Sequence, residues 1–535
     1  MASGYLALVL HAHLPFVRHP EAPGFLEEEW FFEAITETYI PLLLAFERLS
    51  ADDVDFRLTL SISGSLLAML TDDLLKDRYA RKLDLLIELG DKECDRTWRE
   101  DRAYHELAKT YRHRFIEIRD CWRRHGGDLV RPFRALQDAG KLEVITCVAT
   151  HPFFPLLDRN WAAFRAQVHT AADLYERLFG RRTQGMWLGE CGYAPGVDEL
   201  LREEGVRFFF VDTHGVIFAE PRPVFGVHAP IYCRSGVAAF GRDMESSKQV
   251  WSAKEGYPGD PNYRDFYRDI GFDLPESELL GEVGPDGTRI MTGLKYYRIT
   301  GKDPEKQPYQ PTIAAERARE HAQNFVFNRA QQVNHLKSTM PVPPIVVAPY
   351  DAELYGHWWF EGPRFLEQVF RALPGTNGDV EACTLRGYLQ GQPVCVEATP
   401  SASSWGAGGY GEVWVGPEAG WSWRHVHHAT RYVSWLVREH RSADGAVGKA
   451  LDQCIRELLL LQSSDWNFII KTGTSTKYAE GRIRSHTHRL RRLGHLVQTG
   501  MIAGEDARWV DDICARDSFF AGLHGDGLRR PFDQA

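Results

Sequence analysis

Seven short apolar runs recur along the first 350 residues, and longer mixed segments separate them. Most of these runs do not alternate between apolar and polar positions, and β-branched or aromatic residues are common in them. Such runs are typical of strands that are buried on both faces of a parallel sheet. The runs cover residues 5–10, 56–62, 142–148, 185–188, 208–211, 290–294 and 345–347.

Helical patterns lie between several of these runs. Residues 31–49 and 161–179 carry apolar side chains at helical spacing, and residues 195–205 begin with proline and end with glycine. Strands that alternate with helices predict βα units and a parallel sheet, either open or closed into a barrel.

Histidines and carboxylates follow five of the predicted strands. The residues at these ends are His11 and His13, His151, Glu190, His214, and Asp351 with Glu353. In a βα barrel the carboxyl ends of the strands meet at one face, where the βα loops build the active site. The sequence therefore predicts one shared site, to which five separate segments contribute.

Two segments interrupt the alternation of strands and helices. Residues 76–131 are charged and helical in pattern, which predicts a helical insertion, and residues 221–289 predict long loops that could cover the site. After a Trp- and Gly-rich loop at 401–424, helical patterns return. We therefore expect an α/β catalytic domain at 1–400 and an α-helical C-terminal domain at 425–535.

Composition and charge exclude several classes of protein. The 535 residues carry a formal net charge of -10 without a basic stripe, so nucleic acid and anionic membranes are not expected partners. The nine cysteines are scattered without CxxC pairs, which indicates reduced thiols in the cytoplasm. No apolar stretch approaches the roughly 20 residues of a membrane helix. The oligomeric state, monomer or homodimer, stays open.

Glu190 and Asp351 are the best candidates for a catalytic pair, because each follows a strand and lies among Gly, Pro and aromatic residues. Apolar surroundings raise the pKa of a carboxyl group, while hydrogen bonds keep a partner ionised. One carboxylate that attacks and one carboxylic acid that donates a proton are what glycoside chemistry requires. Alternatively, each carboxylate only caps a strand end or forms an ion pair.

A metal site is a competing interpretation of the same strand ends. His11 and His13 could be ligands, and His151, His214 and Asp351 could complete the site of a metal-dependent hydrolase or deacetylase. The fifteen tryptophans favour a sugar polymer instead, because flat rings stack on the apolar faces of pyranoses.

The aromatic residues of the Gly-rich loop predict a lid or rim with sugar-stacking platforms, or a linker pinned to the barrel. They are Trp405, Tyr410, Trp414, Trp421 and Trp423. Trp466 follows an apolar helical run, so its pattern favours the core, and Trp30 fits either role.

Four longer motifs resemble the conserved regions of glycoside hydrolase family 57, and within it the 1,4-α-glucan branching enzymes. "HAHLPF" resembles the first region, "WLGECGYAPG" the nucleophile region, "APYDAELYGHWWFEGP" the acid/base region and "SSDWNF" the last region. The resemblance covers nearly the whole chain. It implies an incomplete (β/α)7 barrel followed by an α-helical C-terminal domain.

The resemblance also implies a function for particular residues. Glu190 corresponds to the nucleophile and Asp351 to the general acid/base of a retaining enzyme without a metal or other cofactor. The implied reaction cleaves an α-1,4-glucan (amylose, amylopectin or glycogen) and transfers the chain to a 6-hydroxyl. The implied groove residues are His11, His13, Trp30, His151, Tyr297, Trp405, Trp414 and Trp466. An α-amylase or 4-α-glucanotransferase on the same scaffold is the alternative, and a glucan-binding protein without catalysis is a more distant one.

The chain departs from the family's pattern at three points. Gly189 stands where the nucleophile motif usually has proline, and Tyr297 stands at a groove position that is often tryptophan. Branching members often carry a mobile loop with a catalytically important tyrosine; the matching stretch, 222–242, is short and offers Tyr232. Because a lid that excludes water favours transfer, the balance between transfer and hydrolysis stays open.

Overall fold

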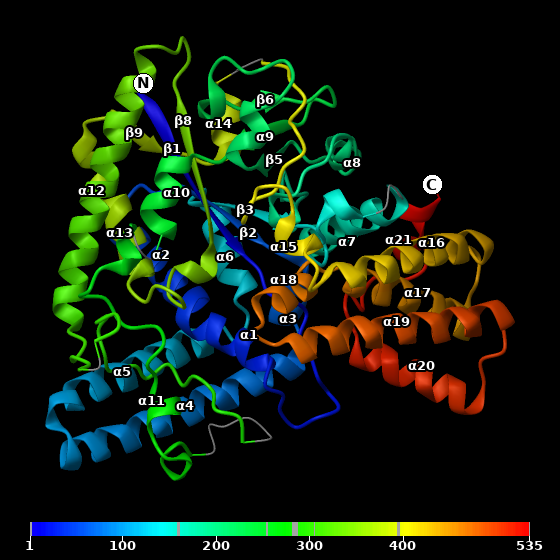
Figure 1. Cartoon of the computed structure of the whole chain (residues 1–535), viewed down its shortest axis with the longest axis horizontal. Coiled ribbons are helices and arrows are strands. Elements are labelled where there is room, and N and C mark those ends of the chain that lie inside the picture. Colours follow the sequence, from blue (N-terminus) through cyan, green and yellow to red (C-terminus); the bar gives the residue numbers. More distant parts are fainter. Residues whose placement is uncertain are drawn as a thin grey trace.

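A computed structural model of the protein describes residues 3–157, 161–252, 255–280, 287–303, 305–392 and 396–533. A curled sheet lies at the centre of the molecule, helices pack around it, and the C-terminal helices form a separate layer at one side (Figure 1). Among the described residues, no helix has both the length and the apolar character that crossing a membrane requires.

The sheet is an incomplete barrel of parallel strands. In space the strands follow the order β6-β7-β5-β4-β3-β2-β1-β8, and β9 pairs with the start of β1. All pairs from β7 to β8 are parallel, while β6 is antiparallel to β7. The strands are β1 (Gly4–Ala12), β2 (Leu58–Ile62), β3 (Leu142–Cys147), β4 (Gly185–Trp187), β5 (Phe208–Val211), β6 (Ile231–Tyr232), β7 (Ala238–Gly241), β8 (Ile345–Asp351) and β9 (Val380–Ala382).

Six of the seven predicted strands are present among the described residues, and one was wrongly placed. Residues 290–294 form no strand; the amides of Thr292 and Gly293 donate instead to the carboxylate of Asp269. Gly293 has a φ of 83°, which an extended strand does not allow. The strand that pairs with β5 in its place is β7, which lies with β6 in the segment 221–289 that the sequence predicted as loops.

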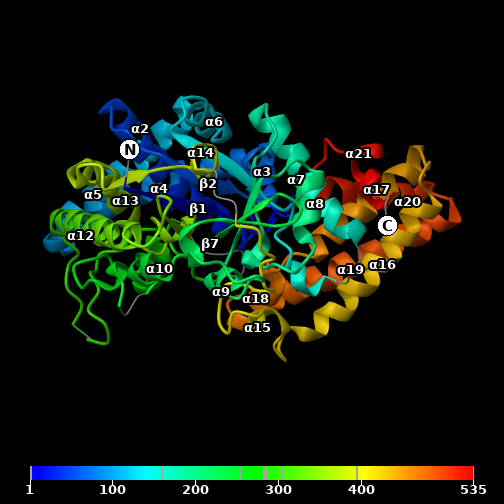
Figure 2. The same cartoon turned by 90° about the horizontal axis from the view of Figure 1, so that it is seen from above.

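Helices cover the sheet on its outer side (Figures 1 and 2). The barrel helices are α1 (Glu28–Ala34), α2 (Ile40–Ala51), α3 (Gly64–Leu70), α6 (Val130–Asp138), α7 (Trp161–Phe179), α8 (Val197–Glu203), α9 (Thr213–Ile217), α10 (Met244–Trp251), α11 (Ile270–Asp273), α12 (Pro311–Lys337), α13 (Gly362–Ala372) and α14 (Leu385–Gly391). The long helices α4 (Asp73–Glu100) and α5 (Arg102–Arg124) pack against each other as a pair beside the barrel.

The C-terminal helical domain is built around one buried helix. Helix α17 (Gly445–Leu461) is buried on nearly all sides, as its continuous apolar run requires, and it packs on α19 and α16. The other helices are α15 (Glu412–Val415), α16 (Trp423–Glu439), α18 (Asp465–Thr472), α19 (Thr476–Thr499), α20 (Gly504–Arg516) and α21 (Asp526–Arg529). The predicted incomplete barrel with a C-terminal helical domain is thereby confirmed.

Candidate active site

A cavity of about 390 Å³ lies at the carboxyl ends of the barrel strands, between the barrel and the C-terminal domain. It is bordered by residues from β1 and β8, from the turn after β4, from the Gly-rich loop and from α18. The predicted residues that line it are His11, His13, Trp30, His151, Glu190, Asp351, Trp405 and Trp414. The structure thus brings together segments that are hundreds of residues apart, as the strand-end pattern predicted.

Glu190 lies in a sharp turn directly after β4. Both Glu190 and Cys191 adopt left-handed backbone conformations, with φ values of 63° and 50°. Non-glycine residues rarely occupy this region, and such strain is concentrated at functional sites. A Cβ on Gly189 would lie 2.4 Å from the carbonyl oxygen of Pro152. Glycine at 189 therefore lets the turn approach the segment after β3 without a clash.

Two donors hold the carboxylate of Glu190. The Trp405 Nε1–H donates to Oε2 at 2.7 Å, and the Ser464 hydroxyl donates to Oε1 at 2.9 Å. Such hydrogen bonds stabilise the ionised form. Burial nevertheless raises the pKa of Glu190 to about 7, and the charge of Asp465 adds to this. Glu190 is therefore poised to be ionised near neutral pH.

A chain of hydrogen bonds runs from β2 to Glu190. Ser61 Oγ lies 3.1 Å from His11 Nδ1, His11 Nε2 lies 3.0 Å from His151 Nε2, and His151 Nδ1 lies 3.0 Å from Ser464 Oγ. Burial keeps the pKa of both histidines well below the ordinary value, so both rings are neutral. Because the Ser464 hydroxyl donates to Glu190, its oxygen accepts from Nδ1–H of His151. Nε2 of His151 then accepts from Nε2–H of His11, and Nδ1 of His11 accepts from the Ser61 hydroxyl. This order fixes one tautomer for each ring.

His13 belongs to a second, charged arrangement. Its Nε2 lies 3.0 Å from Asp465 Oδ1 and its Nδ1 lies 2.9 Å from Ser63 Oγ, while its backbone N–H donates to Glu353 Oε1 at 3.1 Å. Burial lowers the pKa of His13, but the charge and hydrogen bond of Asp465 outweigh it, so the net shift is upward. His13 therefore links the C-terminal domain to the strand end that carries Glu353.

Asp351 ends β8 on the other side of the cavity. Burial, followed by the nearby charges of Glu353 and Glu190, raises its pKa well above the ordinary value, and Arg242 only partly opposes this. Glu353 accepts a 2.5 Å hydrogen bond from the hydroxyl of Tyr39, which stands on a π-helical turn at Ile35–Tyr39. Such turns are frequent at functional sites. Burial and the negative neighbours therefore favour the protonated form of Asp351.

The cavity thus holds two carboxyl groups in different states. Glu190 has donors that favour the carboxylate, and Asp351 has negative neighbours that favour the acid. Environments that push two pKa values apart assign the roles of nucleophile and general acid. Aromatic surfaces of Trp30, Trp405 and Trp414 border the pair, so the site suits a flat-faced, hydroxyl-rich substrate.

Several lining residues were not among the predicted site residues: Arg242, Trp251, Trp358 and Asp465. Arg242 directly follows β7, so the strand-end rule would have found it if the four-residue run at 238–241 had been recognised as a strand. Asp465 stands inside the "SSDWNF" motif, one position before the residue that was chosen.

Two predicted groove residues do not line this cavity. Trp466 is fully buried, and its Nε1–H donates to the carbonyl of Leu460 at 2.8 Å, as the apolar helical pattern favoured. Tyr297 packs against Tyr104, and the guanidinium of Arg268 lies 4.8 Å from its ring centre. Their assignment to the substrate groove stays a prediction.

The Gly-rich loop is fastened over the barrel near the cavity. Trp405 N–H donates to the carbonyl of Glu190 at 2.9 Å, and His214 Nε2 lies 2.7 Å from the carbonyl of Gly409. His214 therefore holds the loop and is not part of the histidine cluster. Tyr232 lies in β6, where it pairs with Ala238, and it does not line the cavity.

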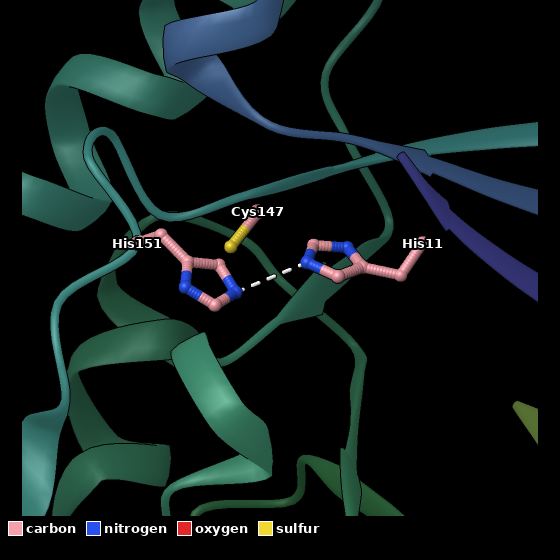
Figure 3. Close-up of side chains that lie close together, drawn as sticks. All are labelled: His11, Cys147 and His151. Carbon is pink, nitrogen blue, oxygen red and sulfur yellow. Dashed lines mark hydrogen bonds between the residues drawn. The ribbon is translucent and has the colours of Figure 1, made fainter. Parts of the chain in front are cut away.

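The same histidines bear on the metal interpretation. Potential ligand atoms of His11, Cys147 and His151 lie within 4.8 Å of one another (Figure 3). Those of His13, His151 and Asp465 are equally close. The dashed line in Figure 3 is the hydrogen bond between the two Nε2 atoms, which a shared metal ion would replace. Burial also keeps the pKa of the Cys147 thiol well above the ordinary value, so it is a poor ligand. Hydrogen bonding accounts for these contacts better than metal coordination.

The chain is similar to known proteins over most of its length. Residues 7–393 match the family model of glycosyl hydrolase family 57, and residues 425–525 match the model for the C-terminal region of 1,4-alpha-glucan branching enzymes. The 1,4-alpha-glucan branching enzyme TK1436 of Thermococcus kodakarensis is 35% identical over 97% of this chain and 77% of its own length.

Three crystal structures share the fold over nearly the whole chain. The alpha-amylase AmyC from Thermotoga maritima has a TM-score of 0.91 at 42% identity and covers 99% of each chain. TK1436, crystallised with glucose, has a TM-score of 0.87 at 33% identity, covering 98% of this chain and 96% of its own. The branching enzyme from Pyrococcus horikoshii has a TM-score of 0.87 at 31% identity, covering 99% and 97%.

Proposed function

The chain belongs to glycosyl hydrolase family 57, and from this premise we propose that it is a retaining 1,4-α-glucan branching enzyme. One observation carries the proposal: a cavity with aromatic walls holds Glu190 with two hydrogen-bond donors to its carboxylate and Asp351 with a pKa raised well above its ordinary value. The match of residues 425–525 to the C-terminal region of branching enzymes supports transfer as the outcome.

The geometry supports a two-step mechanism. Glu190 attacks the anomeric carbon of an α-1,4-glucan while Asp351 gives its proton to the leaving 4-oxygen, so that a covalent glycosyl-enzyme forms and the reducing-end fragment departs. Asp351, now ionised, accepts the proton of the 6-hydroxyl of an acceptor glucan, which attacks the same carbon and releases Glu190. Two inversions give net retention and an α-1,6 branch.

An α-amylase is the second candidate, and two observations favour it. The structure of an alpha-amylase is 42% identical to this chain, and Tyr232 is fixed in the sheet at β6 away from the cavity. If no tyrosine-bearing lid excludes water, water competes with the acceptor 6-hydroxyl for the same glycosyl-enzyme. Both activities would use the same Glu190 and Asp351.

Incubation with amylose separates the two. Reducing ends are counted before and after the product is digested with an isoamylase-type debranching enzyme. We expect most new ends to appear only after debranching, because each α-1,6 branch hides the end that debranching exposes. Reducing ends that accumulate without any debranching-dependent increase would contradict branching and favour the amylase.

We also propose a cytoplasmic location and storage glucans (amylose, amylopectin or glycogen) as substrates. The eight cysteines that the structure describes are all free thiols, and six of them are buried. This usage suits a reducing compartment.

A further inference from the structure

A row of aromatic and imidazole rings lies on the outer face of α16. Its opposite face is buried in the C-terminal domain through Val426, Val433 and Leu436. The outer face carries His425, His428, Tyr432 and Trp435, and Trp421 precedes the helix by two residues. Spacings of three and four place these side chains on one face, over about 15 Å of helix between His425 and Trp435. We call these five residues the α16 ring row.

The rings are ordered relative to one another. Tyr432 and Trp435 have ring centres 6.0 Å apart and planes inclined by 24°, and His428 and Tyr432 are 6.4 Å apart with 27°. The ring of Trp421 meets His425 edge-on at 5.9 Å. Trp435 is 40% exposed, which is high for a tryptophan on a helix whose other face packs well. Two groups of neighbouring rings therefore follow one another along this face, with His428 and Trp435 exposed and the other three residues half-buried.

Helix α19 packs against the α16 ring row and places polar side chains beside it. A Cβ on Gly494 would lie 2.4 Å from the Tyr432 hydroxyl, so the glycine makes room for that ring. The guanidinium of Arg484 lies 5.5 Å from the ring centre of Trp421. Burial and the charges of Arg424, Arg491 and Arg484 lower the pKa of His425, so this imidazole is neutral and can both donate and accept.

We propose that the α16 ring row is a second binding site for an α-glucan chain, separate from the catalytic cavity. The choice of ligand rests on the proposed function. Ring faces offer stacking surfaces for the apolar faces of pyranoses, while the Tyr432 hydroxyl, the imidazoles and Arg484 are suited to sugar hydroxyls. Several consecutive rings along one line match a repeating polymer better than a single small molecule.

The row is continuous with the cavity through the Trp- and Gly-rich loop. Trp405 and Trp414 of this loop line the cavity, and Trp421 is at its end. The Trp423 Nε1–H donates to the carbonyl of Trp414 at 2.8 Å, which ties the start of α16 to the cavity wall. From there α16 runs outward along the C-terminal domain (Figures 1 and 2). A glucan held on the row would thus have its neighbouring segments near the active site.

Such a site predicts an effect that depends on substrate length. A polymer that binds both the row and the cavity gains from a raised effective concentration, whereas a short oligosaccharide can occupy only one of them. Loss of the row should therefore raise KM for glycogen or amylopectin and leave turnover of a short maltooligosaccharide unchanged.

The test is migration of the purified protein in native gels that contain glycogen, which requires binding but no turnover. The variant is Tyr432→Ala with Trp435→Ala. The matched control is Trp98→Ala on α4, because Trp98 is 52% exposed and also has an arginine, Arg102, 4.0 Å from its ring centre. We expect glycogen to retard the wild type and the control, and the double variant to bind about tenfold more weakly.

The outcomes distinguish this inference from its alternatives. Equal retardation of the wild type and the double variant would overturn the second site, provided that both have the same thermal unfolding midpoint. A change from dimer to monomer in the double variant without any change in retardation would also overturn it and identify the row as a contact between two copies. If the variant loses retardation but the amylose test shows only hydrolysis, the branching proposal alone fails.

Discussion

The two catalytic candidates line the same cavity but are held in opposite ways. Glu190 is tied by Trp405 and Ser464, and behind Ser464 a chain of neutral histidines reaches back to β2. Asp351 receives no hydrogen bond to its carboxyl group from any described residue, and its nearest charges include Glu353 and Glu190. The first carboxyl group is therefore held in place by donors that favour its anion, and the surroundings of the second favour the acid.

This difference suits the work that each group has to do. A nucleophile gains from a fixed position and from donors that hold its charge until attack. A residue that first gives a proton and then takes one gains from freedom to turn between two oxygens and from a raised pKa. The asymmetry of hydrogen bonding, more than the identity of either residue, supports the roles that we propose for them.

Removal of Glu190 should have the largest effect. We expect Glu190→Gln to lower kcat on amylose by on the order of 10⁴-fold, because a neutral amide cannot attack the anomeric carbon in place of the carboxylate that Trp405 and Ser464 position. The control is Glu418→Gln, which removes an exposed carboxylate paired with Lys471 and should leave the rate unchanged. Full activity of Glu190→Gln would show that the nucleophile is a different residue.

The same comparison predicts a different result for Asp351→Asn. This variant should be nearly inactive on amylose, yet it should still form the glycosyl-enzyme from an α-glucosyl fluoride, because fluoride leaves without a proton. Glu190→Gln should be unable to do so. Burst kinetics with the fluoride check this, and equal loss in both variants would break the assignment of separate roles.

A smaller effect is expected from the donor to Glu190. Trp405→Phe keeps the aromatic ring but removes the N–H that stabilises the carboxylate, so the pKa of Glu190 rises from about 7. Activity requires ionised Glu190 and is lost as pH falls through this pKa. The acidic limb of kcat/KM should therefore move about one unit to higher pH.

Trp414→Phe is the matched control for this shift. Trp414 lines the same cavity, but its buried Nε1 has no hydrogen-bond partner among the described residues. Its replacement should leave the acidic limb where it is. An equal shift in both variants would mean that loss of ring packing, and not loss of the hydrogen bond, moves the pKa of Glu190.

On the other side of the cavity, Glu353→Gln should change the alkaline limb of the pH profile of kcat/KM. Removing this negative charge takes away one cause that raises the pKa of Asp351. Activity requires protonated Asp351 and is lost as pH rises through its pKa, so the alkaline limb should move about half a unit to lower pH. A pH–rate profile of kcat/KM checks this, and a shift confined to the acidic limb would contradict it.

Much of the barrel was predictable, because buried parallel strands leave an unmistakable apolar pattern. The misplaced strand shows the limit of that pattern. Residues 290–294 are as apolar as a strand, but Gly293 and the carboxylate of Asp269 impose a loop. The true strand, β7, has only four residues, and two of them are alanine. It is a strand because it pairs with β5, and its composition does not indicate this.

The site was predictable as far as it follows strand ends. His11, His151, Glu190 and Asp351 meet because parallel strands bring their carboxyl ends together. The direction of the hydrogen bonds was not predictable, since it depends on Ser464, which the C-terminal domain delivers from more than 270 positions away. Long-range contacts of this kind leave no periodic signal in the chain.

We expect the smallest effect from metal removal. This experiment tests whether the histidines next to Glu190 form hydrogen bonds or bind a metal ion. Each ring nitrogen of His11 and His13, and Nδ1 of His151, already has a partner, and His11 and His151 share a hydrogen bond that requires a proton between them. A metal ion would have to displace that proton and break the chain that ends on Glu190. Exhaustive dialysis against a chelator should therefore change the rate on amylose by less than about twofold. A large loss of activity that zinc restores would show that the histidine rings are metal ligands. The chain of hydrogen bonds from Ser61 to Glu190 would then be wrong.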